Sequence, residues 1–459
     1  MSAPVTESGK LMTFPRGGIH PPEQKITQDQ PIQACPLPQE AVVLLAQHIG
    51  APAELQVKVG DQVKVGTLIG KAPGLISANI HSPVSGKVKK IEPRTDASGY
   101  PKTAVLITVD GDEWEDSVHE SKDFPWNGRP LKRDIQASPE EIRTALANGG
   151  IVGMGGAAFP TNVKYMVPPG KTPEYLIING VECEPYLTAD HRVMLELADE
   201  VMVGTEILRI ALGVEKAIIG IEANKPDALS LMEKKAQDYP NISVQGLVVK
   251  YPQGAEKQLV RAITGREVPS GKLPLDVGCV VNNVGTAQAA YLAVQYNRPF
   301  IDRVLTVTGT GLSNPGNFLV RLGTPIQQVI ELAGGLPEGT GKIILGGPMM
   351  GKATGSLDTP VAKGTSGILL LDQKQAKRAA VQPCIRCSRC VGVCPMGLEP
   401  YILSELARQN RYSEAESRGI MDCVECGSCS YTCPSHRDLV DWIRYGKARI
   451  MANRRKGKA

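Results

Sequence analysis

The chain has 459 residues, of which 42% are hydrophobic, so it is long enough for two to four domains that each bury a core. Its 51 basic and 47 acidic residues give a formal charge of +4, which does not indicate a nucleic-acid partner. No apolar run approaches the ~18 to 20 residues that span a bilayer, and the first residues lack a signal-peptide pattern. We therefore expect a soluble or peripheral membrane protein in a reducing cytoplasm.

Residues 1–40 are rich in Pro and Gln and predict an extended arm with little regular structure. Residues 41–111 contain short alternating apolar runs, which predict a small all-β domain. Its halves, VKVGDQVKVGTLIG and HSPVSGKVKKIEP, resemble the barrel-sandwich hybrid of lipoyl and biotinyl domains. The stretch between them, APGLISANIHSP, has no lysine to carry such a cofactor, so we do not expect a swinging arm.

Residues 112–137 mix acids, Pro, Trp and Gly and predict a linker. Ser138, Pro139 and Glu141 then occupy the N-cap, N1 and N3 positions of a helix that ends at Gly149 and Gly150. Strands alternate with helical patterns up to residue 300, so residues 138–300 predict an α/β domain. The predicted strands are 175–178, 217–221, 247–249 and 277–281, and one helical pattern covers 193–212.

Residues 301–372 predict a small α+β domain of the β-grasp type. RVLTVTGTGLSNPGNFLVRLG predicts its hairpin, and TPIQQVIELAGGL predicts a helix that ends at Gly334 and Gly335. Residues 373–459 predict a helical domain and contain 16 Lys and Arg against eight Asp and Glu. Docking of this basic end onto an acidic ferredoxin-like surface or anionic lipid is one interpretation, whereas we interpret its last seven residues, NRRKGKA, as solvated charge.

Two cysteine motifs, CIRCSRCVGVCP and CVECGSCSYTCP, have the C-x2-C-x2-C-x3-C-P spacing of a bacterial two-cluster ferredoxin. Three thiolates two residues apart bind one 4Fe-4S cluster, and the fourth, followed by proline, reaches the other cluster. The first cluster is therefore predicted to take Cys384, Cys387, Cys390 and Cys433. The second is predicted to take Cys394, Cys423, Cys426 and Cys429. A helix around Ile402, Leu403 and Leu406 is expected to pack between them.

Structural zinc is the alternative interpretation of these motifs. Zinc takes four ligands in two pairs, which explains neither the third and fourth cysteines of each motif nor the prolines. Cys35, Cys183 and Cys279 stand apart from the motifs, and we interpret them as ordinary small residues.

A glycine-rich segment, GIVGMGGAAFPTNVKY, follows the first predicted helix. Its glycines leave room for a phosphate or an aromatic ring near the backbone, although a structural turn remains the alternative. Polar residues then follow the predicted strands in NGVECEPYLTADHR, YPQGAEKQL and VVNNVGTAQAA. Open α/β sheets bind ligands at the carboxyl ends of their strands, so these residues predict a site for ribityl or ribose hydroxyls. A solvated acidic loop with Asp190 as a helix cap is the alternative.

GMGGAAFPTNVKY, NGVECEP, YPQGAEKQL and NNVGT, in this order, resemble the segments around FMN and the nicotinamide nucleotide in the flavin subunit of respiratory complex I. A fuller resemblance, over nearly the whole chain, is to the C-subunit family of the Rnf complex. It rests on FPRGGIHPPEQK, the barrel-sandwich unit, ECEPYLTADHR, GGPMMG and QPCIRCSRCVGVCPMGLEP.

The resemblance implies roles for individual residues. Contacts to FMN or a nucleotide phosphate would come from Gly153, Gly155, Gly156 and Lys164. Phe159 would stack near the nucleotide, Asn179 and Glu182 would face the flavin, and Glu184 would face the nicotinamide nucleotide. Glu256, Asn282, Asn283 and Thr286 would complete the flavin pocket. Three residues depart from the complex I pattern: Ala158 and Val181 stand where Gly and Asp are usual, and Ala255 replaces the first of two glutamates.

The resemblance also implies the activity of an NADH:ferredoxin oxidoreductase component without a catalytic nucleophile. Electrons from NADH would pass through FMN and then singly through two 4Fe-4S clusters to ferredoxin or another iron–sulfur protein. Integral membrane proteins of the complex would couple this transfer to Na⁺ or H⁺ translocation, with this chain peripheral on the cytoplasmic face of the bacterial inner membrane. The alternatives are a cobalamin-reducing flavoprotein, a quinone reductase component, whose family lacks the cluster cysteines, and a non-catalytic docking protein.

Overall fold

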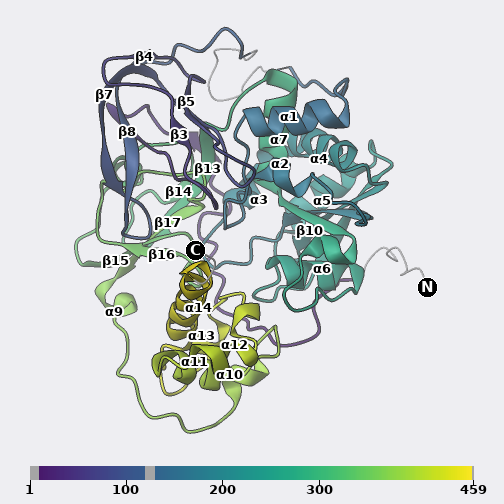
Figure 1. Cartoon of the computed structure of the whole chain (residues 1–459), viewed down its shortest axis with the longest axis vertical. Coiled ribbons are helices and arrows are strands. Elements are labelled where there is room, and N and C mark those ends of the chain that lie inside the picture. Colours follow the sequence, from purple (N-terminus) through teal and green to yellow (C-terminus); the bar gives the residue numbers. More distant parts are fainter. Residues whose placement is uncertain (1–9, 119–129, 457–459) are drawn as a thin grey trace.

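The computed structural model describes residues 10–118 and 130–456. Part of the predicted linker, residues 119–129, and the end of the basic tail, residues 457–459, lie outside the described residues. A β domain and a second, mixed α+β domain lie on one side of the molecule, and an α/β domain lies on the other (Figure 1). A helical domain, yellow in Figure 1, lies below them and carries the two cysteine motifs.

The β domain consists of two antiparallel sheets, as the alternating sequence predicts. The orders are β2-β8-β7-β4 and β3-β5-β6. The strands are β2 Glu40–Leu44, β3 Glu54–Leu55, β4 Gln62–Val63, β5 Leu68–Lys71, β6 Ile80–His81, β7 Ser85–Thr95 and β8 Pro101–Gly111. Alternate apolar residues such as Val43, Ile69, Ile80 and Val105 form the core of this domain.

The α/β domain has a four-stranded parallel sheet with the order β11-β10-β9-β12. Its strands are β9 Tyr175–Gly180, β10 Lys216–Glu222, β11 Ile242–Leu247 and β12 Cys279–Asn283. Its helices are α1 Pro139–Asn148, α2 Thr161–Lys164, α3 Ala189–Glu196, α4 Ala198–Leu212, α5 Pro226–Ala236, α6 Glu256–Thr264, the 3-10 turn η1 Pro274–Val277 and α7 Val284–Tyr296. Leu176 and Ile178 pack in the main core with residues of α4 and α7, whereas Ile177 packs with residues of α6.

The start of this domain follows the sequence prediction. The Ser138 hydroxyl accepts from the N–H of Glu141, and the Glu141 carboxylate accepts from the N–H of Ser138, so the predicted capping box is confirmed. One prediction is wrong. The strand predicted at 247–249 lies at Ile242–Leu247 instead, and the N–H of Val248 donates to the carbonyl of Met12 in the arm. The helical pattern over 193–212 forms the end of α3 and all of α4, and the two helices are separated at Leu197, whose φ of −122° and ψ of 27° are not helical.

The α+β domain has a six-stranded sheet with the order β1-β14-β13-β17-β15-β16. Its strands are β1 Ile32–Ala34, β13 Asp302–Gly309, β14 Gly316–Arg321, β15 Thr340–Leu345, β16 Lys352–Thr354 and β17 Gly367–Asp372, and its helix is α8 Ile326–Leu332. The antiparallel β13–β14 pair confirms the predicted hairpin. β1 belongs to the arm and pairs in parallel with β14, so the arm contains a strand that its composition did not predict.

The helical domain contains short helices around the cysteine motifs and two longer ones that pack on each other. Its elements are α9 Gln373–Ala376, α10 Arg389–Gly392, α11 Pro400–Arg408, α12 Tyr412–Ser417, the 3-10 turn η2 Ile420–Asp422, α13 Ser428–Tyr431 and α14 Leu439–Lys456. Leu403 and Leu406 of α11 join Ile443 and Ile450 of α14 in a small core. Within residues 10–118 and 130–456, no helix is both long and apolar enough to cross a bilayer.

Candidate functional site

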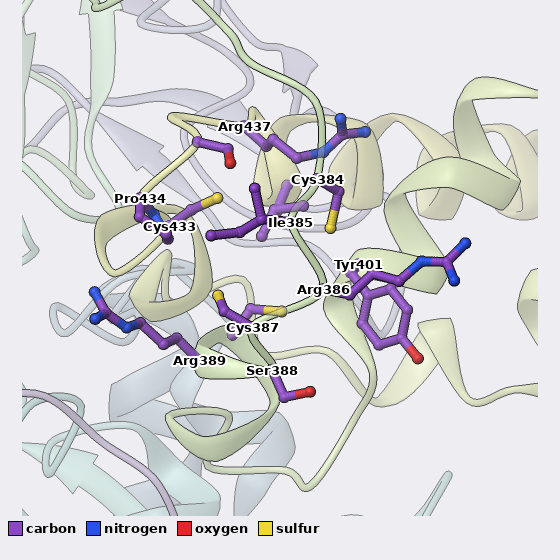
Figure 2. Close-up of a pocket in the computed structure, with 13 residues that line it drawn as sticks. Cys384, Ile385, Arg386, Cys387, Ser388, Arg389, Tyr401, Cys433, Pro434 and Arg437 are labelled. Atoms are coloured by element: carbon purple, nitrogen blue, oxygen red, sulfur yellow. The ribbon is translucent and has the colours of Figure 1, made fainter.

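Four cysteines from both motifs line one cavity of about 230 Å³ in the helical domain (Figure 2). They are Cys384, Cys387, Cys390 and Cys433. The sulfur atoms of Cys384, Cys387 and Cys433 surround one space in Figure 2. This outer set is the one predicted for the first cluster, and the structure brings it together although residue 433 lies in the second motif.

The remaining four cysteines of the motifs form a second, more buried group. Burial, together with the nearby Cys426 and Cys394, raises the pKa of the Cys423 thiol to about 12. Burial also raises the pKa of Cys429, and Cys423, Cys426 and Cys394 act in the same direction. The pKa of Cys390 is raised by burial and by a different pair of neighbours, Cys433 and Cys384. Cys394 therefore lies close enough to the three cysteines of the second motif to interact with them electrostatically, and their binding of one cluster stays a prediction. We call these four residues the inner set.

Both sets fit a cluster better than a single ion. Four sulfurs around one zinc would stand about 3.8 Å apart, given a Zn–S bond of about 2.3 Å. Within the described residues, no three His, Cys, Asp or Glu side chains are arranged to hold a metal ion. A 4Fe-4S cluster binds each thiolate through a different iron, so it requires wider spacing. Binding of iron would also stabilise thiolates that burial alone disfavours.

The inner set lies against the α/β domain and the arm. The Tyr251 hydroxyl donates to the carbonyl of Cys426 at 2.8 Å, and Tyr251 is 2% exposed. The N–H of Gly18 donates to the carbonyl of Val393 at 2.9 Å. A Cβ on Gly17 would lie 2.6 Å from the backbone of Cys394, so only glycine fits this approach.

The glycine-rich loop crosses the turn between β12 and α7. The N–H of Gly153 donates to the carbonyl of Phe159 at 2.8 Å, and the N–H of Met154 donates to the hydroxyl of Thr286 at 3.0 Å. Gly155 faces Asn283, whereas Gly156 faces open space with a φ of +147°. Phe159 is half-buried at the end of the loop.

Ala158 is one of the three departures from the complex I pattern. Its φ is +51°, in the left-handed region that favours glycine. The loop therefore keeps a glycine-like backbone although the residue is alanine. Ala255, another departure, is the N-cap of α6 and provides no side-chain cap for that helix.

Several predicted residues meet at the carboxyl edge of the sheet. Lys164 donates to the carbonyl of Val281 at 2.7 Å and lies 3.0 Å from the Glu256 carboxylate. The Asn179 amide donates to the carbonyl of Gly254 at 2.9 Å. The Asn282 amide donates to the Tyr165 hydroxyl at 2.6 Å.

Two buried oxygens at this edge lack partners. Asn282 Oδ1 and Thr161 Oγ1 have no hydrogen-bond partner among the described residues. Unpaired buried polar atoms are costly, so they suit a site that binds a polar ligand. Together with the open space at Gly156, they fit the chemistry of a flavin or nucleotide site at this edge, whose residues stay a prediction.

The two glutamates of the loop between β9 and α3 are held by protein groups. The Glu182 carboxylate accepts from the N–H groups of Asp190 and His191, so it caps α3. Burial, together with the Glu182 carboxylate, raises the pKa of Asp190 to about 7. The Glu184 carboxylate accepts from the N–H groups of Met349 and Met350 in the GGPMMG loop of the α+β domain, at 3.0 and 2.8 Å.

Sequence analysis missed two lysines beneath this loop. Lys25, in the arm, donates to the carbonyls of Glu182, Glu184 and Leu187 at 2.8, 2.9 and 2.6 Å. Lys225 donates to the carbonyl of Val181 at 2.8 Å. Burial, together with the neighbouring Lys225, lowers the pKa of Lys25 to about 8. The arm segment FPRGGIHPPEQK was singled out, but nothing in it indicated which residue supports the loop.

Comparison with protein families matches four consecutive parts of the chain. The matched models are described as the RnfC barrel sandwich hybrid domain at residues 12–112, the Nuo51 FMN-binding domain at 146–292, the SLBB domain at 304–353 and the 4Fe-4S dicluster domain at 376–444.

Three curated relatives match nearly the whole chain. The C subunit of the proton-translocating ferredoxin:NAD(+) oxidoreductase complex of Clostridium ljungdahlii is 46% identical over 97% of this chain and 95% of its own length. The C subunit of the Na(+)-translocating complex of Acetobacterium woodii is 45% identical over 96% of this chain and 98% of its own length. The C subunit of the ion-translocating oxidoreductase complex of Rhodobacter capsulatus is 43% identical over 95% of this chain and 83% of its own length.

Proposed function

The chain belongs to the C-subunit family of ion-translocating ferredoxin:NAD(+) oxidoreductase (Rnf) complexes, and from that premise we propose that it connects NADH to the electron carriers of such a complex. It is a subunit of the oxidoreductase with an FMN-binding domain and a two-cluster 4Fe-4S domain. The observation that carries the proposal is that both domains occur in one chain, with the inner cysteines against the edge of the α/β domain.

The α/β domain would bind FMN and NADH at the carboxyl edge of its sheet. A bound flavin supplies the change from two-electron to one-electron transfer, which a nicotinamide and an iron–sulfur cluster cannot make between themselves. Gly153, Gly155 and Gly156 would admit the cofactor, and Lys164 would face a phosphate. Asn282 and Asn283, with Thr286 behind the loop, would shape the pocket. These residues position the reactants and exclude water, and none acts as a nucleophile.

Glu184 has a different part in this proposal from the one that the resemblance implied. Its carboxylate already receives two N–H groups of the GGPMMG loop, and Met349 of that loop packs in a small apolar cluster with Tyr251 and Cys426. Glu184 would therefore hold the α+β domain in place at the junction with the inner cysteines. Glu184 would contact the nicotinamide nucleotide in addition to holding this junction.

The contacts support an order for the two clusters. The hydrogen bonds that reach the cysteine motifs from the α/β domain and the arm end on Val393, Pro395 and Cys426, next to or within the inner set. The outer set lies on the exposed side, where Cys384 and Cys387 are both exposed. Electrons would thus pass between the α/β domain, the inner cluster, the outer cluster and a partner.

The partners and the location are proposed at the level of the complex. Iron–sulfur proteins of the complex or ferredoxin would exchange electrons with the outer cluster, and integral membrane proteins would couple the transfer to Na⁺ or H⁺ movement. The chain would be peripheral on the cytoplasmic face of the bacterial inner membrane.

Anaerobic reconstitution with iron, sulfide and FMN tests this function. The full chain should bind about eight iron atoms, as two 4Fe-4S clusters require, and one FMN. NADH should then bleach the bound flavin. The proposal fails if iron reaches only one cluster per chain, or if NADH leaves a bound flavin oxidised.

A further inference from the structure

The outer cysteine set lies within a long exposed segment that contains no acidic residue. We propose that residues 377–389, which we call the basic segment, are the docking surface for an acidic iron–sulfur protein that exchanges electrons with the outer cluster. This proposal rests on the proposed function, because it names the kind of partner and the surface that the partner contacts. It differs from the interpretation of the basic tail, whose last residues lie outside the described part of the chain.

Exposure distinguishes the basic segment from the rest of the chain. Every residue from 377 to 389 is exposed, and the segment includes two of the four outer cysteines. The inner set, by contrast, has Cys394, Cys426 and Cys429 buried. An exposed cluster is useful for electron exchange only if a partner can approach it closely. The outer cluster is thus open on one side and shielded by the protein on the other.

Charge indicates the chemistry of the partner. Between Asp372 and Glu399 the sequence has five basic residues and no acidic one: Lys374, Lys377, Arg378, Arg386 and Arg389. Arg386 and Arg389 form no ion pair with any side chain that the structure describes, and both point away from the cysteine sulfurs in Figure 2. The nearby acids Asp438 and Asp441 are paired with Arg378, and Glu405 with Arg437. The surface is therefore positive where a partner would meet the cluster.

Exposed apolar side chains in the basic segment indicate that a protein partner covers this surface. Ile385 is 68% exposed and Val381 is 54% exposed, and Ile385 lies between the cysteine ligands Cys384 and Cys387. Protein interfaces commonly combine an apolar centre with a charged rim. Here Ile385 would form the centre, and Arg386 and Arg389 the rim. An acidic protein matches the basic rim of this surface, and its own iron–sulfur cluster supplies or accepts the electron.

Electron transfer from a ferredoxin tests the docking surface directly. A small acidic two-cluster ferredoxin, reduced with dithionite and freed of excess reductant, is mixed with the oxidised full chain in a stopped-flow instrument. We expect R386E/R389E to lower the second-order rate constant at least tenfold at low ionic strength, because charge steering accelerates association by about 10- to 1000-fold. The difference from wild type should shrink towards twofold at about 0.5 M salt.

Two further variants separate the effect of charge beside the cluster from the effect of net charge, and cluster measurements detect structural damage. K374E/K377E changes the same number of charges at the start of the acid-free stretch without touching the residues between the ligands, and it should lower the rate by a smaller factor in the same direction. K87E/K90E places the same change on exposed residues of β7 in the β domain, and it should leave the rate unchanged. Iron content and the EPR signals of both clusters are measured for every variant.

Equal rates for R386E/R389E and wild type at low salt, with both clusters intact, would overturn the proposal. So would an equal loss in K87E/K90E, because this would make net charge the cause. Sedimentation with vesicles of equal phosphatidylcholine and phosphatidylglycerol tests a lipid surface instead. If R386E/R389E lost vesicle binding but kept the wild-type rate of electron transfer from ferredoxin, the proposal would also be refuted. None of these measurements uses NADH, so failure of the flavin site is recognised separately.

Discussion

Replacement of Lys25 by Met tests whether the arm holds the loop that carries Glu182 and Glu184. The ammonium makes three hydrogen bonds to loop carbonyls, and each bond to a charged donor contributes about 1.5–3 kcal/mol. Three bonds at the lower value amount to about 4.5 kcal/mol. The cost of a buried ammonium offsets part of this, so we expect a net loss of about 2–3 kcal/mol in K25M.

Hydrogen exchange of residues 181–187 and the dissociation constant of FMN are the two measurements. At pH 7 the Lys25 ammonium is charged, because its pKa of about 8 lies above that value. In K25M these amides should exchange at least tenfold faster and FMN should bind more weakly, whereas K25R should recover part of both. Unchanged exchange and unchanged FMN affinity in K25M would refute the role of the arm.

Three further results are expected at the domain junction and the clusters. Burial raises the pKa of Glu184 from 4.5 to about 7, so its contribution to stability is present below pH 4.5 and is lost as the pH rises through 7. Between pH 6 and 8 the free energy of unfolding should fall more in wild type than in E184Q, and parallel profiles would contradict this. G347A should lower that free energy by ~2 kcal/mol or more, because the new Cβ would overlap the Glu184 carboxylate, whereas G355A meets open space. Equal losses in the two glycine variants would disprove the packing argument. C394A should remove the EPR signal and the iron of the inner cluster alone, and loss of the outer cluster instead would reverse the ligand assignment.

Features encoded by adjacent residues were predictable from the sequence. The capping box at Ser138 lies within four residues, and the β13–β14 hairpin within about twenty. The cysteine groups were also predictable, because the motif spacing determines which three thiols face one cluster. Cys433 shares a cavity with the cysteines of the first motif and Cys394 lies near those of the second, whereas the cluster that each binds stays a prediction.

Contacts between distant segments were not predictable from local patterns. Lys25 meets the loop 157 to 162 residues away, and Glu184 meets Met349 across 165 residues. Such contacts depend on how the domains pack, and a single lysine in an irregular arm leaves no periodic signal. The contact of Val248 with Met12 in the arm is another such contact, and it lies just beyond the strand Ile242–Leu247 that the sequence misplaced to 247–249.

Freeze-quench EPR after a single addition of NADH tests the central claim, the path from the flavin domain through the inner cluster to the outer one. C433A disrupts the outer set, and its remaining inner cluster should still be reduced by NADH. C394A disrupts the inner set, so its flavin should bleach while the remaining outer cluster stays oxidised. Rapid reduction of the outer cluster in C394A, or an oxidised inner cluster in C433A, would contradict this path.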